Sequence, residues 1–310
     1  MKILITGGAG YIGSILTPLL LDKGYRVTVL DNLLFRQTSL LNCCINPDFA
    51  FIYGDISDRS AMKSLLASHD VVIPLAAIVG APACSQNPAL AKLVNEEAPL
   101  WMLEQLSIDQ NVVFPTTNSG YGVGESESFC DENSPLRPIS DYAKAKVKVE
   151  EAYLQKGNSV SFRLATVFGM SPRMRMDLLV NDFVYRAVND RFIVLFEEHF
   201  RRNYIHIRDV AEVFSFGIDN INDMKGQSFN VGLSTANLTK MQLCEKIKEH
   251  VPTFEIYVSA IGKDPDQRDY VVSNEKIESL GWAPKYTLDI GIDELVKGYQ
   301  IVKANIYVNA

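Results

Sequence analysis

The sequence predicts an α/β fold, a doubly wound parallel sheet with a smaller C-terminal substrate-binding lobe. Three observations lead to this prediction. Short apolar runs alternate with amphipathic stretches over the first two thirds of the chain, which is typical of βαβ units. The first apolar run is followed directly by a cluster of glycines, and a helical pattern follows that cluster. After Gly169 the alternation loosens into shorter, mixed elements, as expected of a second lobe.

The apolar runs give the strands in order: KILIT (2–6), RVTVL (26–30), FAFIY (49–53), DVVIPL (70–75), NVVFPT (111–116) and SVSFRLA (159–165). Helical stretches at 58–68, 86–108 and 138–156 separate most of them, which implies right-handed crossovers. GQSFNV (226–231) is expected to return to the main sheet. We therefore predict a nucleotide-binding domain at 1–170, with 208–232 returning to it, and a lobe built from 171–207 and 233–310.

Composition limits the class of protein. With 310 residues, 47% of them hydrophobic, the chain can bury a sizeable core. A net charge of −7 argues against broad nucleic-acid binding, which needs a basic face. The five cysteines show neither CxxC nor metal spacing, so we expect no metal and a reducing compartment. No long apolar stretch and no cleavable leader are visible, so we expect a cytoplasmic protein without a membrane span.

The glycine cluster has the spacing G-x-x-G-x-x-G, at Gly7, Gly10 and Gly13. In such a turn one glycine permits the tight bend, another lets a pyrophosphate approach the backbone, and the last allows close helix–sheet packing. The N-terminus of the helix then offers N–H groups to the phosphates. By itself the pattern also fits an ordinary strand–turn–helix corner.

Asp31 closes the second strand and favours the dinucleotide interpretation. A carboxylate there can accept hydrogen bonds from both adenosine ribose hydroxyls, and it would repel a 2′-phosphate, which favours NAD over NADP. Arg36 lies close enough in sequence to leave NADP open. Asp55-Ile56 follow the third strand and could hold the adenine edge, although Asp55 also suits a helix entry.

Tyr142 and Lys146 lie four residues apart on a predicted helix and therefore share a face. A lysine cation and an oxidised nicotinamide would both favour phenolate. Lowering the phenol pKa from about 10 by about three units needs roughly 4 kcal/mol. The phenolate could then take the proton of a sugar hydroxyl while hydride leaves its carbon. Y-x-x-x-K is frequent on any helix, so its meaning here comes from the glycine turn upstream.

TTNSGYG (116–122) follows the fifth strand, at the end where parallel sheets bind ligands. Thr117 could therefore hydrogen-bond the reacting oxygen. Without Tyr142 the segment would be taken for an ordinary polar turn.

Taken together, GGAGYIG, Asp31, Asp55, LAA (75–77), TTNSGYG, YAKAK and LGWAP (280–284) resemble the extended short-chain dehydrogenase/reductase family. More narrowly, the chain resembles the NAD-dependent epimerase/dehydratase branch, which acts on nucleotide sugars. The resemblance covers nearly the whole chain. It implies a Rossmann fold, bound NAD and a C-terminal lobe for a nucleotide-diphosphate sugar.

The resemblance also implies roles for individual residues. Tyr142 resembles the active-site base, Lys146 the residue that lowers its pKa and holds the nicotinamide ribose, and Thr117 the family's Ser or Thr. The implied cofactor-binding residues are Gly7, Gly10, Tyr11, Ile12, Gly13, Asp31, Asn32, Asp55, Ile56, Leu75, Ala76 and Ala77, with Tyr142 and Lys146. The implied substrate-binding residues are Asn95, Asn118, Ser119, Asn181, Arg202 and Arg268, the two arginines on the diphosphate.

Two departures from the family pattern bear on the reaction. Sugar 4,6-dehydratases follow the catalytic Thr with Asp-Glu, whereas Asn118-Ser119 stand here and cannot do that acid–base work. This argues against a dehydratase. Thr166, in RLATVFG (163–169), stands near the place of the usual nicotinamide-loop asparagine.

The shared first step of this branch is oxidation of a sugar hydroxyl, usually at C4. Four segments resemble a subgroup that oxidises GDP-heptoses at C4 for bacterial capsule polysaccharide: GAPAC (80–84), TNSGYG (117–122), SPRMRMDLLVNDF (171–183) and EEHFRRNYIH (197–206). A UDP-sugar 4-epimerase is the alternative, and a non-catalytic NAD-sensing scaffold is a remote one. In the family, helices corresponding to 86–108 and 138–156 pair in a dimer, so a homodimer is expected, although core packing alone could explain their apolar residues.

Overall fold

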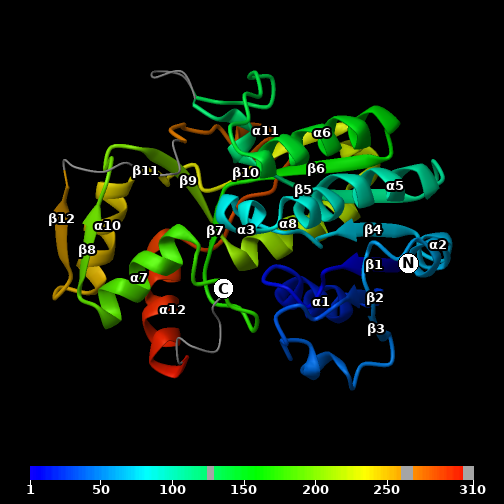
Figure 1. Ribbon diagram of the computed structural model, residues 1–310, viewed down its shortest axis with the longest axis horizontal. Coiled ribbons are helices and arrows are strands. Elements are labelled where there is room, and N and C mark those ends of the chain that lie inside the picture. Colours follow the sequence, from blue (N-terminus) through cyan, green and yellow to red (C-terminus); the bar gives the residue numbers. More distant parts are fainter. Residues whose placement is uncertain (124–128, 260–267, 303–310) are drawn as a thin grey trace. The chain divides into compact units, whose positions relative to one another are not determined.

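The computed structural model describes residues 1–123, 129–259 and 268–302 (Figure 1). The chain divides into two compact units. The first unit consists of residues 1–120, 138–163 and 211–229, and the second of 121–137, 164–210 and 230–310.

The first unit is built on a seven-stranded sheet with the strand order β10-β6-β5-β4-β1-β2-β3. Its strands are β1 (Lys2–Thr6), β2 (Arg26–Asp31), β3 (Phe49–Tyr53), β4 (Val71–Pro74), β5 (Asn111–Thr117), β6 (Ser159–Leu164) and β10 (Gln227–Val231). The pairs β1–β2, β2–β3, β1–β4 and β4–β5 are parallel. The predicted doubly wound sheet is therefore confirmed, and the late strand takes the place beside β6. The order reverses on either side of β1, which is where such sheets bind ligands.

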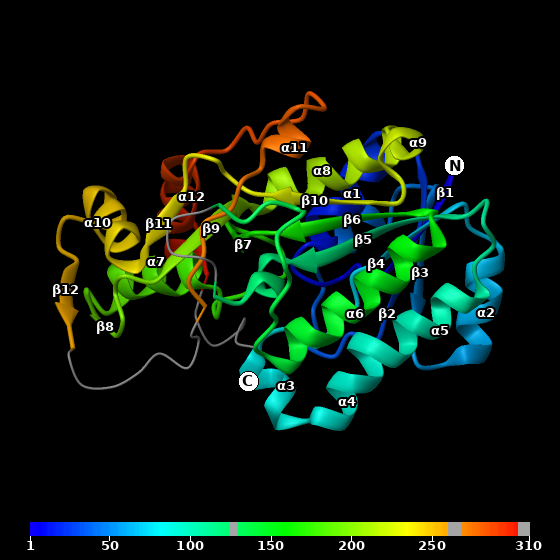
Figure 2. The ribbon, with the colours of Figure 1, turned by 90° about the horizontal axis from the view of Figure 1, so that it is seen from above.

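Helices cover both faces of this sheet (Figure 2). The helices α2 (Arg59–Ala67), α5 (Ala98–Gln105) and α6 (Asp141–Lys156) pack on one face, and Val112 and Phe114 of β5 point into the core beneath them. The opposite face carries α1 (Gly13–Asp22) and α8 (Ile207–Asp219), followed by α9 (Ile221–Met224). There Phe162 of β6 contacts Phe214 of α8. Apolar side chains of β5 and β6 are therefore buried on both faces of the sheet, because successive residues of a strand point to opposite faces.

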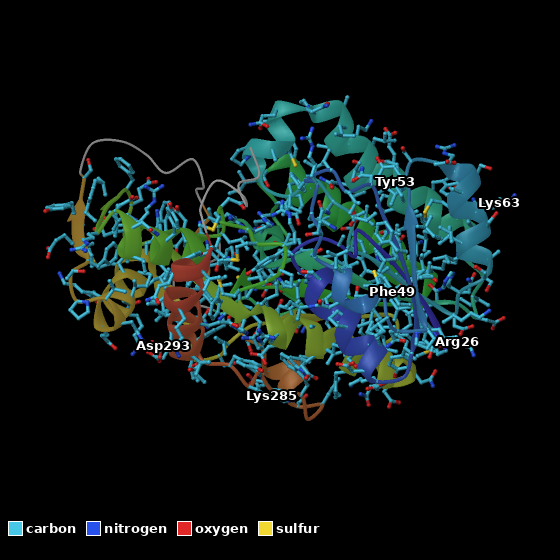
Figure 3. The ribbon with its side chains drawn as sticks, turned by 90° about the horizontal axis from the view of Figure 1, so that it is seen from below. Arg26, Phe49, Tyr53, Lys63, Lys285 and Asp293 are labelled. Carbon is cyan, nitrogen blue, oxygen red and sulfur yellow. The ribbon has the colours of Figure 1, made fainter. Side chains whose placement is uncertain are left out.

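One edge of the sheet is β3, whose residues Phe49 and Tyr53 are labelled in Figure 3. Tyr53 is 73% exposed. A short 3₁₀ turn (Leu41–Cys43) precedes this strand. Among the described residues, the strand pairs with β2 alone, starting with Phe49 opposite Val27.

The stretch predicted as helical from 86 to 108 is interrupted. It contains the end of α3 (Ala81–Gln86), then α4 (Pro88–Lys92), a π-helical turn (Leu93–Glu97) and α5. Pro88 begins α4, and the Asn87 side chain accepts a hydrogen bond from the Leu90 amide as its cap. Pro99 lies in the first turn of α5. Because proline has no N–H to donate, a continuous α-helix through either residue would lose a hydrogen bond.

The second unit contains two smaller sheets. A three-stranded sheet has the order β11-β9-β7, from β11 (Asn237–Thr239), β9 (Arg201–His206) and β7 (Thr166–Phe168). Strands β8 (Phe192–Leu195) and β12 (Glu255–Val258) form a parallel pair. The helices are α7 (Leu179–Asn189), α10 (Lys240–His250), α11 (Glu275–Glu278) and α12 (Leu288–Ile301). Over the described ranges of the chain, no helix is both long enough and apolar enough to span a membrane.

Candidate functional site

The three glycines of the first turn are required for different reasons. Gly7 has φ +71°, and a Cβ there would lie 2.6 Å from backbone atoms of Ala76. A Cβ on Gly13 would lie 2.4 Å from the carbonyl oxygen of Gly8, so only glycine lets α1 start this close to the turn. Around Gly10 a Cβ would meet only the Gly7 oxygen, at 3.1 Å. The turn is therefore most tightly packed at its two ends and less crowded at its middle, where a phosphate-binding turn needs room.

Asp31 fastens this turn to the end of β2. The carboxylate is 7% exposed; Oδ2 accepts a hydrogen bond from the Ala9 amide at 3.0 Å and Oδ1 one from the Leu33 amide at 2.8 Å. The Nε2 group of Gln37 also donates to Oδ1, at 3.3 Å. Arg36, the neighbour of Gln37 in the sequence, is exposed. The acidic group therefore lies beside the middle of the glycine turn, at Ala9.

Asn32 and Asp55 are also brought together, because the Asn32 amide donates to Asp55 Oδ2 at 2.8 Å. Burial works to raise the pKa of Asp55, but hydrogen bonds from Ser57 and Asn32 outweigh it and lower the pKa below its ordinary value. Ile56 is buried in the core beneath α2. The segment Leu75–Ala77 follows β4 and is half-buried, with the Leu75 amide donating to the Thr6 carbonyl at 2.9 Å.

Helix α6 positions Tyr142 and Lys146. It begins after Ser140, whose hydroxyl accepts a hydrogen bond from the Ala143 amide at 3.2 Å. Tyr142 is half-buried. Lys146 is 4% exposed, and its Nζ lies 3.4 Å from the Pro115 carbonyl oxygen and 4.8 Å from the centre of the Phe114 ring. Burial lowers the pKa of Lys146 to about 8.

This buried cation carries a testable cost to folding. The Lys146 pKa is about 8 in the folded chain against 10.5 for the free group, so the folded state resists protonation. The penalty is present in full below pH 8 and disappears as the pH rises toward 10.5. Lys146→Met is expected to raise the free energy of unfolding by up to about 3 kcal/mol at pH 7 and hardly at all above the pKa of a free lysine.

Urea unfolding at the two pH values measures this difference. Lys144→Met is the matched control on the same helix, since the Lys144 side chain is 58% exposed and pairs with Asp141 at the surface. It should change little at either pH. A Lys146→Met variant that is less stable than the parent at pH 7 would contradict the assignment of a destabilising buried charge.

The residues after β5 fold into a short 3₁₀ turn (Asn118–Tyr121). Thr117 Oγ1 donates to the Ser119 hydroxyl at 2.9 Å and accepts from the Ser119 amide at 3.1 Å. Asn118 is fully buried, and within the described part of the chain neither atom of its side-chain amide has a hydrogen-bond partner. Thr117 and Ser119 are thus held together, while Asn118 points into the interior.

The side chains of Asn95 and Asn181 each form hydrogen bonds with backbone groups. On the π-helical turn, Asn95 Oδ1 accepts from the Ile78 amide at 2.9 Å and its Nδ2 donates to the Ile78 carbonyl at 2.8 Å. Asn181, in the second unit, accepts from the Gly169 amide at 3.0 Å and donates to the Arg175 carbonyl at 2.9 Å. Both are buried. A contact of either with substrate stays a prediction.

Arg202 and Arg268 are neighbours in the second unit. The Arg202 side chain donates to the carbonyl oxygen of Arg268 and, at 2.8 Å, to that of Arg201. Its guanidinium lies 5.7 Å from the centre of the Tyr270 ring. Arg202 is 4% exposed and Arg268 is half-buried. The Arg202 side chain is therefore held against the backbone of Arg268, a residue far from it in the sequence. Thr166 lies in β7 and is half-buried.

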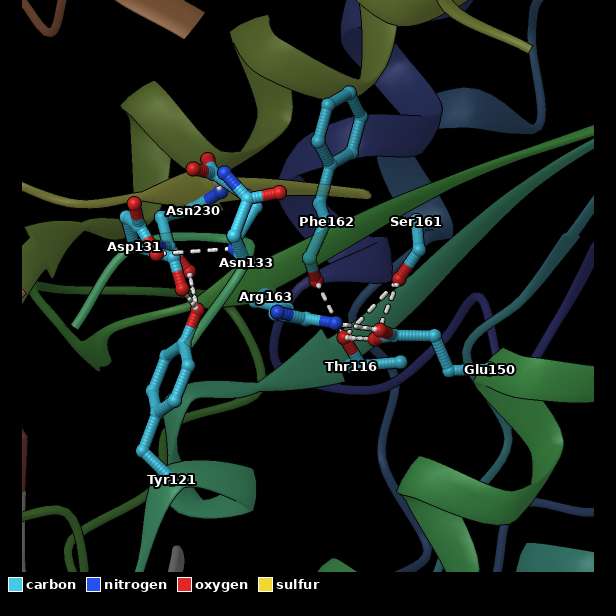
Figure 4. Close-up of polar contacts among 10 residues, drawn as sticks. Thr116, Tyr121, Asp131, Asn133, Glu150, Ser161, Phe162, Arg163 and Asn230 are labelled. Atoms are coloured by element: carbon cyan, nitrogen blue, oxygen red, sulfur yellow. Dashed lines mark hydrogen bonds and ion pairs between the residues drawn. The ribbon is translucent and has the colours of Figure 1, made fainter. Parts of the chain in front are cut away.

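Sequence reasoning missed a buried polar cluster within the first unit. Glu150 of α6 is 2% exposed and receives hydrogen bonds from Thr116, Ser161 and Arg163, as the dashed lines of Figure 4 show. The available signal was the spacing, since Glu150 follows Lys146 by four residues and so shares its face of the helix.

The chain is similar to known proteins along nearly its whole length. Residues 3–232 match the family described as the NAD dependent epimerase/dehydratase family. Among curated relatives, the CDP-paratose 2-epimerase of Salmonella typhi is 25% identical over 95% of this chain and 98% of that protein. The UDP-glucose 4-epimerase of Halalkalibacterium halodurans is 27% identical over 92% and 91%. Among solved structures, the UDP-glucose 4-epimerase of Thermus thermophilus in complex with NAD has a TM-score of 0.82 and 26% identity, covering 97% of this chain and 99% of that one.

Proposed function

Because this chain belongs to the NAD-dependent epimerase/dehydratase family, we propose that it oxidises a nucleotide sugar at C4 to a 4-keto sugar, with a GDP-manno-heptose as the favoured substrate. Family membership makes the chain an NAD-dependent enzyme of nucleotide-sugar epimerase/dehydratase type. The observation that carries the proposed oxidation is the pair Tyr142 and buried Lys146 on α6, because Lys146 Nζ lies 3.4 Å from the Pro115 carbonyl oxygen on the strand that bears Thr117. The choice of a GDP-manno-heptose rests on the resemblance of sequence segments.

NAD fits the residues of the first unit. Gly10 leaves space where a Cβ would stand, so the diphosphate would approach the backbone there. Asp31 would accept hydrogen bonds from the adenosine ribose, and Lys146 would hold the nicotinamide ribose. Bound NAD supplies the hydride acceptor. We assign NAD binding to 1–170 with 208–232, and nucleotide-sugar binding to 171–207 and 233–310.

The chain's own groups would move the proton. The Lys146 cation favours the phenolate of Tyr142, which then takes the proton of the C4 hydroxyl. Thr117 would donate a hydrogen bond to the oxygen that becomes the ketone. Arg202 and Arg268 would bind the diphosphate, because guanidinium groups pair well with phosphate oxygens. Asn118-Ser119 leave no acid and base for expelling water, so a 4,6-dehydratase is not proposed.

A UDP-sugar 4-epimerase is the second candidate. The relatives named UDP-glucose 4-epimerase favour it, whereas the segments GAPAC (80–84), SPRMRMDLLVNDF (171–183) and EEHFRRNYIH (197–206) favour the GDP-heptose enzyme by resemblance. The two differ in the fate of the 4-keto sugar. An epimerase returns the hydride to the other face, and a dehydrogenase releases the ketone and needs an oxidant for its reduced cofactor.

The decisive experiment offers the purified protein a panel of GDP- and UDP-sugars, with and without a keto-acid oxidant, after its bound nicotinamide has been identified. Net turnover of a GDP-manno-heptose only with the oxidant supports the dehydrogenase. Isomerisation of a UDP-sugar without the oxidant supports the epimerase. If the protein acts on none of the nucleotide sugars in the panel, the proposal is refuted.

The preference for NAD is expected to depend on Asp31. Asp31→Asn removes the charge that repels a 2′-phosphate, so the ratio of NADP to NAD affinity should rise at least about tenfold, because like-charge juxtaposition costs on the order of a few kcal/mol. Titration calorimetry with both cofactors measures it. Asp48→Asn removes the same charge from a surface ion pair with Arg26 and should leave the ratio unchanged. Equal ratios in the two variants would contradict this role of Asp31.

We also infer a homodimer in the cytoplasm. Val149 and Tyr153 of α6 are buried in the core of the first unit, while Leu100 and Leu103 of α5 are only half-buried. A helix of the second subunit would cover the exposed parts of these two leucines. A monomer mass in light scattering would exclude the dimer.

A further inference from the structure

Helix α6 carries three polar side chains one turn apart: Tyr142, Lys146 and Glu150. They share one face of the helix because residues four apart are neighbours on its surface. The first two belong to the proposed reaction. Glu150 has no part in it, yet it is 2% exposed, and a carboxylate is buried this deeply only when its charge and its hydrogen bonds are satisfied.

Both oxygens of Glu150 are fully engaged. Oε2 accepts from the Thr116 hydroxyl at 2.5 Å and from the Ser161 hydroxyl at 2.9 Å. Oε1 accepts from Arg163 Nε at 2.8 Å and Nη2 at 2.6 Å, and the Arg163 side chain is 8% exposed. The ion pair balances the buried charge. The hydroxyl bonds do something further, since they tie α6 to two different strands.

One of those strands carries the residues of the reaction. On β5 the carbonyl of Pro115 faces Lys146 Nζ, the hydroxyl of Thr116 binds Glu150, and Thr117 is the next residue. Fixing Thr116 against α6 therefore fixes how far along the helix Thr117 stands. Ser161 lies instead on β6, which carries none of the proposed reacting groups.

We propose that Glu150 is a positioning residue that sets the register of α6 on β5 through Thr116, and thereby the placement of Thr117 relative to Tyr142. This rests on the proposed function, in which Tyr142 and Thr117 act on the same sugar oxygen. The ion pair with Arg163 keeps Glu150 charged and oriented, and the Thr116 hydrogen bond transmits the register to the strand.

The chain offers a matched pair of variants. Thr116→Val and Ser161→Ala each remove one hydroxyl donor from the same Glu150 oxygen, but only Thr116 lies on the strand of Thr117. With the sugar identified in the panel, Thr116→Val is expected to lower kcat about tenfold with KM nearly unchanged, since small misplacements of reacting groups are costly. Ser161→Ala and the conservative Thr116→Ser should keep kcat within about twofold.

A second measurement needs no sugar. Ultraviolet difference titration of the NAD-bound parent against Tyr142→Phe reports the Tyr142 phenolate. Its pKa is expected to change by about one unit in Thr116→Val, because the polar groups of β5 would then stand at a different distance from the phenolate oxygen, and to stay unchanged in Ser161→Ala. A Tyr142 phenolate that responds equally to both variants, or to neither, would overturn the positioning role alone. Loss of any Tyr142-dependent titration would overturn the proposed base, and this role with it.

Discussion

Tyr142→Phe is expected to lower kcat about 10³-fold while NAD stays bound, since a positioned acid–base group contributes roughly 10²- to 10⁴-fold. The substitution removes one oxygen from a half-buried ring and leaves the helix and Lys146 in place. The rate loss should therefore appear mainly in kcat, and the affinity for cofactor should fall much less. Turnover of the sugar found in the panel measures the rate, and the nicotinamide released from denatured protein measures the bound cofactor.

Tyr153→Phe is the matched control, on the same helix. The Tyr153 hydroxyl donates to the Pro99 carbonyl at 2.8 Å, and its ring stacks on Phe114 with centroids 5.1 Å apart. Removing this buried hydrogen bond should cost stability, about 1–3 kcal/mol, and leave kcat intact. If Tyr142→Phe turned over as fast as Tyr153→Phe, or kept full function in the cell, the non-catalytic NAD-binding alternative would have to be taken up again.

Gly7→Ala is expected to abolish NAD binding and to weaken the fold of the first unit. A Cβ at Gly7 would stand 2.6 Å from the backbone of Ala76, where no flexible side chain can move away, and its φ of +71° is unfavourable for alanine. The turn would have to shift away from the end of β4. Titration calorimetry should show NAD affinity falling at least about 100-fold, equivalent to about 3 kcal/mol.

Alanine variants of two further glycines distinguish the effect of backbone strain from the effect of filling the diphosphate site. Gly24→Ala places alanine at φ +82° with no atom within 4 Å of the new Cβ, so it should cost only about 1 kcal/mol of backbone strain and leave NAD binding unchanged. Gly10→Ala meets only the Gly7 oxygen, at 3.1 Å, so the chain should fold while the space for the diphosphate is filled. Normal NAD affinity in Gly10→Ala would show that the diphosphate does not approach the turn there.

The main sheet was predictable because its strands are the apolar runs themselves. Ile3, Ile5 and Val29 are fully buried, and a run that is apolar on both faces has few other places to go in a protein of this size. The distant strand Gln227–Val231 was also predicted, although only its alternate residues Phe229 and Val231 are apolar. The glycine turn was predictable from the spacing of its glycines between a strand and a helix, and Asp31 at the end of the second strand favoured its interpretation as a dinucleotide site.

The interruption of the helical stretch and the Glu150 cluster were not predicted. Apolar spacing does not reveal a change in the hydrogen-bond pattern, so the π-helical turn was invisible apart from the prolines Pro88 and Pro99. A glutamate on a helix is ordinarily taken as solvent-exposed. Its partner Arg163 lies in a strand predicted as apolar, and only the packed fold brings the two together.

The π-helical turn at Leu93–Glu97 also restricts insertions and deletions in this part of the chain. It holds one more residue than an α-helical turn would, and the Asn95 amide within it pairs with both backbone groups of Ile78, just past Leu75–Ala77. Deleting one residue would rotate Asn95 by about 100° around the helix axis relative to α5. Insertions and deletions should therefore be excluded from this turn during evolution, even where substitutions at exposed positions such as Glu97 are accepted.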